Sequence, residues 1–293
     1  MFDTNVLFEP IGESSAPVAS NPSSEPESDA RDTNMIEISG LSHTFDKGGK
    51  NEFKLFDNFN FVVEDAPKRG EVISFMGGSG CGKSCILKVI AGLMVPDSGK
   101  VLIHGKPLKE YGNVPMVFQA YSNFRWMTVL ENVALPMILK GVPKDLANKK
   151  AMEIIRLVGL EPHAMKYAKA SNLSGGQLQR ISIARCLADD SRVFLLDEAT
   201  GALDIKMKRE IQDLILKLCY ESDYEPTILN VTHSVEEALY ISNRIVVLKP
   251  NPCTIHKVMD IEYGCKRDQS VLESQKFSEY SKELTKALDE VCK

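Results

Sequence analysis

The sequence predicts an α/β fold in which helices cover both faces of a mostly parallel sheet. Short apolar runs, such as residues 71–76 and 192–197, stop at glycines or at an acid, as buried parallel strands do. Segments with helical spacing of apolar residues alternate with these runs. Residues 126–190 show helical patterns and none typical of strands, so we expect a helical subdomain inserted in the α/β fold there.

The composition is that of an ordinary globular protein, with 43% hydrophobic and 26% charged residues among 293. The formal net charge of -5 argues against a nucleic-acid partner, because neutralising phosphates requires a basic excess. The seven cysteines include no CxxC pair, which favours reduced thiols over a zinc site. The longest apolar runs are too short to cross a bilayer, and no signal peptide is expected at the start.

The chain is expected to consist of three parts. Residues 1–34 are rich in serine, proline and acids and are expected to form a disordered leader. Residues 35–262 are expected to form the main domain, with its helical subdomain over about 126–190, and residues 263–293 a helical extension. Apolar side chains in this extension share one helical face, which favours a helix that caps its own domain over one that binds a partner. These side chains are Phe277, Tyr280, Leu284, Leu288 and Val291.

Within the main domain the elements are predicted in chain order. Residues 35–41 alternate like a strand, and residues 53–65 give one or two more. The run 71–76 is a buried strand, and a helix follows over 83–93, where apolar residues recur at helical spacing. The helix positions are Ile86, Leu87, Val89, Ile90 and Leu93. Further strands are predicted at 100–105, 114–118, 192–197, 227–233 and 244–249.

The sequence GGSGCGKS at residues 77–84 fits G-x-x-x-x-G-K-[ST] between a predicted strand and a predicted helix. Glycines let backbone N–H groups curl around phosphates, and the positive end of the helix adds to the attraction. Lys83 is expected to reach the β- and γ-phosphates, and Ser84 to bind Mg²⁺ through its hydroxyl. Since the pattern arises by chance in about one chain of this size in a hundred, a turn that binds nothing is disfavoured.

The predicted strand over residues 192–197 ends in an acid, and a second acid follows it. Asp197 stands at its carboxyl end, where ligands bind in open α/β sheets, and is expected to hold Mg²⁺ through its water shell. Glu198 is expected to point along the pleat toward the γ-phosphate and to polarise the attacking water. Such a pair is a weak signal alone and a strong one beside a phosphate loop.

The segment LSGGQ, residues 173–177, places two glycines at the head of a helical pattern. It predicts a second helix end directed at phosphate, separate from the first loop. Because one nucleotide needs only one loop to cradle its phosphates, this segment predicts a site that another subunit completes.

These motifs, in this order, resemble those of the ATP-binding subunits of ABC transporters over residues 35–262. The resemblance implies a P-loop NTPase (RecA-like) fold, with an antiparallel β subdomain beside the mostly parallel sheet. It also implies a Q-loop glutamine, a D-loop and a switch histidine in addition to the motifs above. The implied catalytic residues are Lys83, Gln119, Glu198 and His233, and the implied metal-binding residues are Ser84, Gln119 and Asp197. The implied nucleotide-binding residues are Phe45, Gly77, Gly78, Ser79, Gly80, Cys81, Gly82, Lys83, Ser84, Cys85, Ser174, Gly175, Gly176, Gln177 and Asp204.

The same resemblance implies ATP and Mg²⁺ as ligands and ATP hydrolysis coupled to transport as the reaction. Two such subunits, in a homodimer or with a homologue, would enclose two ATP molecules, and Gln119 would link each to a transmembrane permease. A solute-binding protein would take part indirectly, and no nucleic-acid partner is expected. The expected location is the cytoplasmic face of the cell membrane.

Residues 117–136 and 197–204 look like the nitrate, sulfonate and taurine importers, which makes a small anionic solute the expected cargo. Those importers carry Pro-Phe where Ala199 and Thr200 stand here. The alternatives are an ATPase of a lipoprotein-release or cell-division machine, and a soluble ABC ATPase outside transport. An inactive relative is disfavoured by the intact motifs. At Cys81, a small residue that fills a tight loop is favoured over a redox brake.

Overall fold

The computed structural model describes residues 34–64, 70–108, 114–169, 171–221, 224–263 and 267–292, which belong to one compact unit. The predicted leader lies outside these residues, apart from Asn34.

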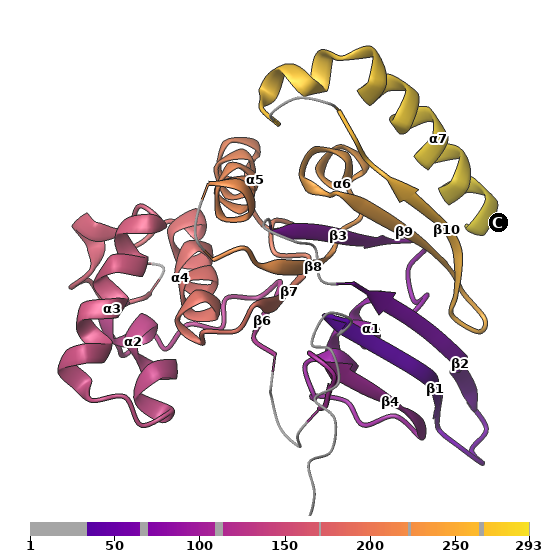
Figure 1. The fold of residues 1–293 in the computed structure, drawn as a ribbon, viewed down its shortest axis with the longest axis horizontal. Coiled ribbons are helices and arrows are strands. Elements are labelled where there is room, and N and C mark those ends of the chain that lie inside the picture. The colour runs from indigo at the N-terminus through magenta and orange to yellow at the C-terminus, as the bar shows by residue number, and fades with distance from the viewer. Residues whose placement is uncertain are drawn as a thin grey trace, which may run out of the picture. The chain divides into compact units, whose positions relative to one another are not determined.

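A six-stranded sheet has the order β10-β9-β3-β8-β7-β6 and forms the centre of this unit (Figure 1). Neighbouring strands from β9 to β6 run parallel, which confirms the predicted mostly parallel core, and β10 pairs with β9 in the antiparallel sense. The strands are β3 (Glu71–Met76), β6 (Met116–Val117), β7 (Val193–Asp197), β8 (Thr227–Val231), β9 (Arg244–Lys249) and β10 (Thr254–Asp260).

A second, four-stranded antiparallel sheet has the order β2-β1-β4-β5. The segment predicted as one or two strands is the single strand β2, which pairs along most of its length with β1. The strands are β1 (Ile36–Phe45), β2 (Phe53–Val63), β4 (Ser98–Ile103) and β5 (Lys106–Pro107). This sheet is the antiparallel β part that the family resemblance implies.

Helices lie on both sides of the central sheet. Figure 1 shows α1 between the two sheets, α5, α6 and α7 on the opposite side, and α2, α3 and α4 grouped beyond the β6 edge. The helices are α1 (Lys83–Ile90), α2 (Val129–Leu139), α3 (Lys144–Leu157), α4 (Gly175–Ala188), α5 (Ile205–Tyr220), α6 (Val235–Ile241) and α7 (Gln275–Val291). Two 3₁₀ turns, η1 (Glu161–His163) and η2 (Gln269–Glu273), complete the described helical elements.

The helix predicted over 83–93 ends early. It stops at Ile90 because Gly92 adopts a left-handed conformation with φ of 70°. Leu93, which was predicted to be a position of this helix, is therefore past the helix end and 55% exposed. The prediction was wrong for that residue and right for the four apolar positions before it, which are buried.

Alternation along β3 sends side chains to both faces of the sheet, where they join three hydrophobic clusters. Ile73 and Phe75 of β3 join a cluster with α1 and the antiparallel sheet. Val72 joins a cluster with α2–α5, and Met76 one with α6 and α7. All six residues of β3 are buried, so this strand forms a rigid support for the loop that follows it.

The C-terminal helix α7 packs on α6, β9 and β10. The predicted apolar face contacts this core: Leu284 and Val291 are buried, and Phe277, Tyr280 and Leu288 pack against them. Two polar contacts with β10 flank this core, His256 Nε2 to Glu290 at 3.1 Å and the Lys257–Glu283 ion pair at 2.7 Å. The helix therefore caps its own domain, as favoured from the sequence.

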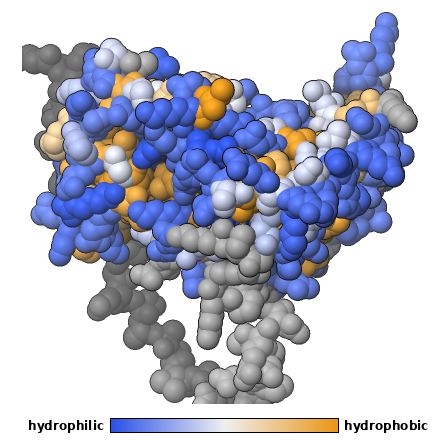
Figure 2. Space-filling model, turned by 90° about the horizontal axis from the view of Figure 1, so that it is seen from above, coloured by the Kyte–Doolittle hydropathy of each residue, from blue (hydrophilic) through white to orange (hydrophobic). Residues whose placement is uncertain are grey.

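Exposed apolar side chains do not form one continuous area on the face shown in Figure 2. The face seen in Figure 2 is largely hydrophilic, and hydrophobic residues appear on it in separate patches. Among the described residues, no helix combines the length and the apolar character needed to span a bilayer.

Candidate nucleotide-binding and active site

Three neighbouring strands deliver the predicted site residues to one edge of the sheet. The glycine-rich loop follows β3, Asp197 ends β7 and Glu198 directly follows it, and His233 comes shortly after β8. Because these strands are parallel and adjacent, their carboxyl ends lie together. The fold thus brings together residues that are more than a hundred positions apart in the chain.

The loop over residues 77–84 needs glycine at its first position. Gly77 has φ of 150°, and a Cβ there would sit 2.5 Å from the carbonyl oxygen of Leu248. Gly82 is the N-cap of α1 with φ of 105°. Gly80 also has positive φ and no heavy atom near a Cβ position, while Gly78 and Ser79 complete the turn. The backbone therefore curls into the start of α1 as predicted for a phosphate loop.

The Lys83 side chain lies within this loop and is 5% exposed. Its ammonium group donates hydrogen bonds to the carbonyls of Gly77 at 2.9 Å and Gly78 at 2.8 Å, and lies 3.7 Å from the Cys81 sulfur. These partners are neutral acceptors, so the positive charge is available to an anion in the loop. The loop is thus cationic at its centre.

Ser84 and Asp197 come together as the sequence predicts. The Ser84 hydroxyl donates to Asp197 Oδ1 at 2.8 Å. A hydroxyl and a carboxylate oxygen are hard ligands that fit Mg²⁺, which keeps several waters and takes substrate phosphates as further ligands. Gln119, in the turn after β6, places its amide nitrogen 3.7 Å from a Cβ position on Gly201, just beyond β7.

Glu198 and His233 are in direct contact. Glu198 Oε1 lies 2.8 Å from His233 Nε2. The direction of the Glu198 side chain was predicted from the pleat of the preceding strand, but Glu198 lies outside β7. It lies one residue beyond and has a left-handed backbone with φ of 49°, which the bonds Glu198 N–H to Val231 and Gly201 N–H to Glu198 hold in place. This turn, rather than strand alternation, aims its carboxylate at the histidine.

Residues 173–177, hereafter the signature segment, lead into α4 with a capping box. Ser174 Oγ accepts from the Gln177 N–H at 3.3 Å, and Gln177 Oε1 accepts from the Ser174 N–H at 2.9 Å. The Gly176 N–H points at the Met207 sulfur at 3.2 Å. The amides at this helix start are therefore held in a fixed orientation, as an anion-binding end requires.

Other residues that hold this segment were not identified from the sequence. The Nε2 atom of His163 lies 2.6 Å from the Gln177 amide nitrogen. Tyr121 places its hydroxyl beside Gly175, and Met207 comes from the start of α5. Their separation in sequence leaves no local pattern, so only the fold reveals them.

The remaining predicted residues lie at the rim of the site or at element ends. Phe45 ends β1, is 43% exposed and meets His43 edge-to-face at 4.7 Å between ring centroids. Asp204 is the N-cap of α5 and accepts from the Met207 N–H at 2.9 Å. Cys85 is half-buried in the first turn of α1, and burial raises the pKa of its thiol.

Comparisons with known proteins agree with this geometry. A profile of the ABC transporter family matches residues 61–201. An ABC transporter ATP-binding protein of Methanocaldococcus jannaschii is 40% identical over 88% of this chain and 93% of its own length. A taurine import ATP-binding protein of Roseobacter denitrificans is 43% identical over 65% of this chain and 70% of its own. A spermidine/putrescine import ATP-binding protein of Clostridioides difficile is 40% identical over 73% of this chain and 59% of its own.

The fold is similar to that of solved cassettes. A dimeric ATP-binding cassette in a post-hydrolysis state, bound to ADP and Pi, aligns with a TM-score of 0.64 and 30% identity over 78% of this chain and 99% of that one. Members of this family bind ATP with Mg²⁺ and hydrolyse it. The phosphate loop, the acidic strand end and the signature helix of this chain lie in the region that the family profile and the relatives cover. The chain belongs to the ATP-binding proteins of ABC transporters.

Proposed function

We propose that this chain is the ATP-hydrolysing subunit of an importer for a small anionic solute of the nitrate, sulfonate or taurine type, at the cytoplasmic face of the membrane. We further propose the division into a leader over 1–34, an ATP-binding domain over 35–262 with a helical subdomain at about 126–190, and an extension over 263–293. The observation that carries the proposal is the convergence of the phosphate loop, the Ser84–Asp197 contact and the Glu198–His233 contact at one sheet edge.

In this proposal the phosphate loop holds ATP through its backbone amides, and Lys83 turns from the loop carbonyls to the phosphate oxygens. Ser84, Asp197 and Gln119 would hold Mg²⁺, which supplies charge neutralisation at the phosphates when bound. Phe45 would stack on the adenine. Since phosphoryl transfer depends mainly on positioning and electrostatics, a preformed cationic loop favours it.

Glu198 would accept a proton from the attacking water or orient that water, and His233 would hold Glu198 in place and contact the transferred phosphoryl group. Both side chains are partly exposed, so water reaches them. The Glu198 carboxylate and the imidazole are within hydrogen-bonding distance before any nucleotide is added. This arrangement supports general-base chemistry.

The signature amides and Ser174 face away from the chain's own phosphate loop in function, toward ATP held by a second copy. Support for a homodimer comes from the dimeric cassettes among the structural neighbours. Asp204 and its helix α5 would lie at the same subunit contact. Gln119 and the helical subdomain would transmit closure to a permease, and a solute-binding protein would deliver cargo to that permease.

The assignment of Glu198 is tested by Glu198→Gln. We expect the variant to bind ATP and dimerise with wild-type affinity but to turn over about a hundred-fold or more slowly, because the amide is no base. The measurement is steady-state phosphate release beside nucleotide binding. Glu236→Gln, an exposed acid on α6, is the matched control and should keep wild-type turnover. Unchanged turnover in Glu198→Gln would refute the assignment.

The transport role is tested by tagging the chain, solubilising membranes in mild detergent and identifying what copurifies. A multi-span permease at fixed stoichiometry supports the importer, and the permease's own solute, followed in vesicle uptake, tests the anion class. Uptake of a polyamine would overturn the anionic cargo. Recovery only from the soluble fraction would overturn the transport role and favour a soluble ABC ATPase.

A further inference from the structure

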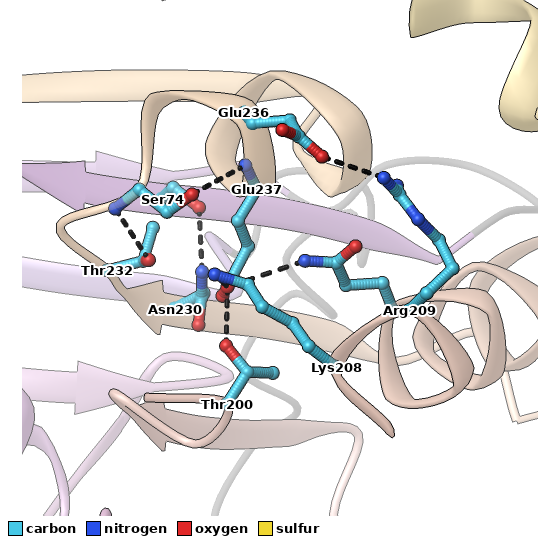
Figure 3. A network of polar contacts seen from close by, with 10 residues as sticks. Ser74, Thr200, Lys208, Arg209, Asn230, Thr232, Glu236 and Glu237 are labelled. Atoms are coloured by element: carbon cyan, nitrogen blue, oxygen red, sulfur yellow. Dashed lines mark hydrogen bonds and ion pairs between the residues drawn. The ribbon is translucent and has the colours of Figure 1, made fainter. Parts of the chain in front are cut away.

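A buried carboxylate lies behind the Glu198–His233 contact. It belongs to Glu237 in α6, which is 1% exposed. Its Oε2 accepts a hydrogen bond from the Thr200 hydroxyl, lies 2.9 Å from the Lys208 ammonium and 3.4 Å from the Gln212 amide nitrogen (Figure 3). One oxygen atom thus joins three segments: the turn after β7, the first half of α5, and α6.

The Glu237 carboxylate binds its partners strongly because it is buried away from water. A buried charge is tolerated only when a counter-charge and hydrogen bonds compensate its desolvation, and removing one partner is costly. Lys208 supplies the counter-charge, and Thr200 supplies the hydrogen-bond donor from the turn. The three segments therefore have one favoured arrangement around Glu237.

Two of these segments carry Glu198 and His233. Thr200 follows Glu198 by two residues, within the turn that the Gly201 N–H closes on the Glu198 carbonyl at 2.9 Å. His233 directly precedes Ser234, the N-cap of α6, whose hydroxyl accepts from the Glu237 N–H at 3.2 Å. The two segments are thus joined at the site by Glu198–His233 and behind it by Thr200–Glu237.

The third segment reaches the signature helix. The first turn of α5 is capped by Asp204, contacts Gly176 through the Met207 sulfur, and contacts Glu237 through Lys208. A displacement of the signature segment would therefore move Lys208 relative to Glu237.

We propose that Glu237, Thr200 and Lys208 are positioning residues: the Thr200–Glu237 hydrogen bond sets the Glu198–His233 contact, and Lys208 couples that contact to the signature segment. This inference rests on the roles proposed for Glu198 and His233.

The test compares Thr200→Val, which removes the hydroxyl at constant shape, with Thr200→Ser, which keeps it. In the full-length protein we expect Thr200→Val to lower kcat about ten-fold with KM for ATP within about two-fold of wild type. Thr200→Ser should stay within about three-fold in kcat. Wild-type kcat in Thr200→Val, an equal loss in both variants, or a loss confined to KM would each overturn the proposal.

The matched control is an ion pair between the same two helices, formed by the residues next to Lys208 in α5 and next to Glu237 in α6. Arg209 and Glu236 pair at 2.7 Å across the same two helices, with Glu236 62% exposed, and Glu236→Gln should leave kcat unchanged. A fall in kcat of Glu236→Gln as large as that of Thr200→Val would point to general loosening of α5 and α6, and it would overturn the specific role of Glu237.

A second variant, Lys208→Met, keeps the aliphatic stem and removes the charge. We expect the same fall in kcat, and in the double variant with Thr200→Val a smaller loss than the product of the single losses, because both groups act on one oxygen. Independent, multiplicative losses would overturn the coupling.

If Thr200→Val does not fold, the kcat and KM values of Lys208→Met alone test the proposal. Full turnover in Glu198→Gln would refute the proposed roles, whereas an inactive Glu198→Gln beside an unaffected Thr200→Val would refute only this inference.

Discussion

The backbone of Gly175 lies so close to Tyr121 that a Cβ on it would sit 2.5 Å from the tyrosine hydroxyl oxygen and 3.3 Å from a Leu203 methyl group. The backbone of Gly175 is outside the left-handed region, so space rather than φ demands glycine at this position. The start of the signature helix is therefore shaped by a side chain from the segment that follows β6.

This contact predicts the effect of Gly175→Ala. We expect the added methyl group to push Tyr121 aside, shift the start of α4, and lower ATPase turnover by about ten-fold or more with little change in ATP binding. Tyr121→Phe in the same chain should restore part of the turnover, because the ring carbon that bore the hydroxyl is 3.5 Å from the methyl position. An absence of rescue would show that the glycine is needed for another reason. Phosphate release and nucleotide binding are the measurements.

Site residues differ in how far the sequence could reveal them. The phosphate loop, Asp197 and the signature are local patterns with a physical reason for each residue type, and the fold places them as expected. The contacts of His163 and Glu237 join segments far apart in the chain, so no spacing rule could find them. The direction of Glu198 was also beyond reach, since its left-handed backbone depends on tertiary hydrogen bonds.

Among the elements, α7 shows how an amphipathic pattern becomes a docked helix. Ser274 caps it by accepting from the Phe277 N–H at 3.1 Å, and Leu284 is fully buried between α6, β9 and β10. The polar contacts of Lys257 and His256 with this helix lie at its exposed margins. Packing of the apolar face therefore dominates its attachment.

Leu284→Ala should lower the free energy of unfolding by about 2–5 kcal/mol, because it leaves a cavity in a close-packed core. Glu283→Gln, the adjacent position, removes only a half-exposed ion pair with Lys257 and should cost no more than about 1 kcal/mol. Denaturant titration of both variants checks the difference. Equal values would show that α7 is held by its charges, contrary to the packing argument.

The elements that the sequence missed share a cause. Strand β10 has an exposed, alternating pattern at the edge of the sheet, and β5 has two residues, so neither carries a strong apolar run. The buried strands β3, β7, β8 and β9 were all predicted, since every one of them carries a continuous apolar segment. The continuous apolar segments identified the four buried strands, whereas β10 has one buried residue and β5 is only two residues long.

Across the whole molecule, the cysteine thiols differ in burial, and the buried ones have raised pKa values. Burial raises the pKa of Cys186 and Cys219 to about 12, and burial with the neighbouring Cys81 and Cys85 thiols raises that of Cys253 to about 12. Cys292 is exposed, and its sulfur lies 3.4 Å from a Cβ position on Gly78 in the phosphate loop. The six described cysteines are free thiols.

In a Cys265→Ser background, which removes the cysteine outside the described residues, one thiol should react rapidly with a disulfide reagent at pH 8. The thiolate is the reactive form, and a pKa near 12 leaves almost none at the sealed positions until pH rises well above 10. Cys292→Ser should abolish the rapid phase, and denaturant should expose the rest. Bound ATP should slow the rapid phase, since Cys292 adjoins the loop. Several rapid thiols in the native protein would contradict this ordering.

The pairing of β6 with the sheet extends over two residues, with Met116 opposite Leu195 and Val117 opposite Leu196. The chain then passes through Gln119 into α2 and α3 and returns along α4. So short a ladder resists twisting weakly, whereas β7 is held along its full length by β8. The region around Val117 is therefore expected to act as a hinge of low torsional stiffness, whose amides exchange with deuterium well before those of β8. Motion of the helices α2–α4 relative to the sheet is then expected to require little free energy. The buried strands that carry the site remain undistorted during this motion.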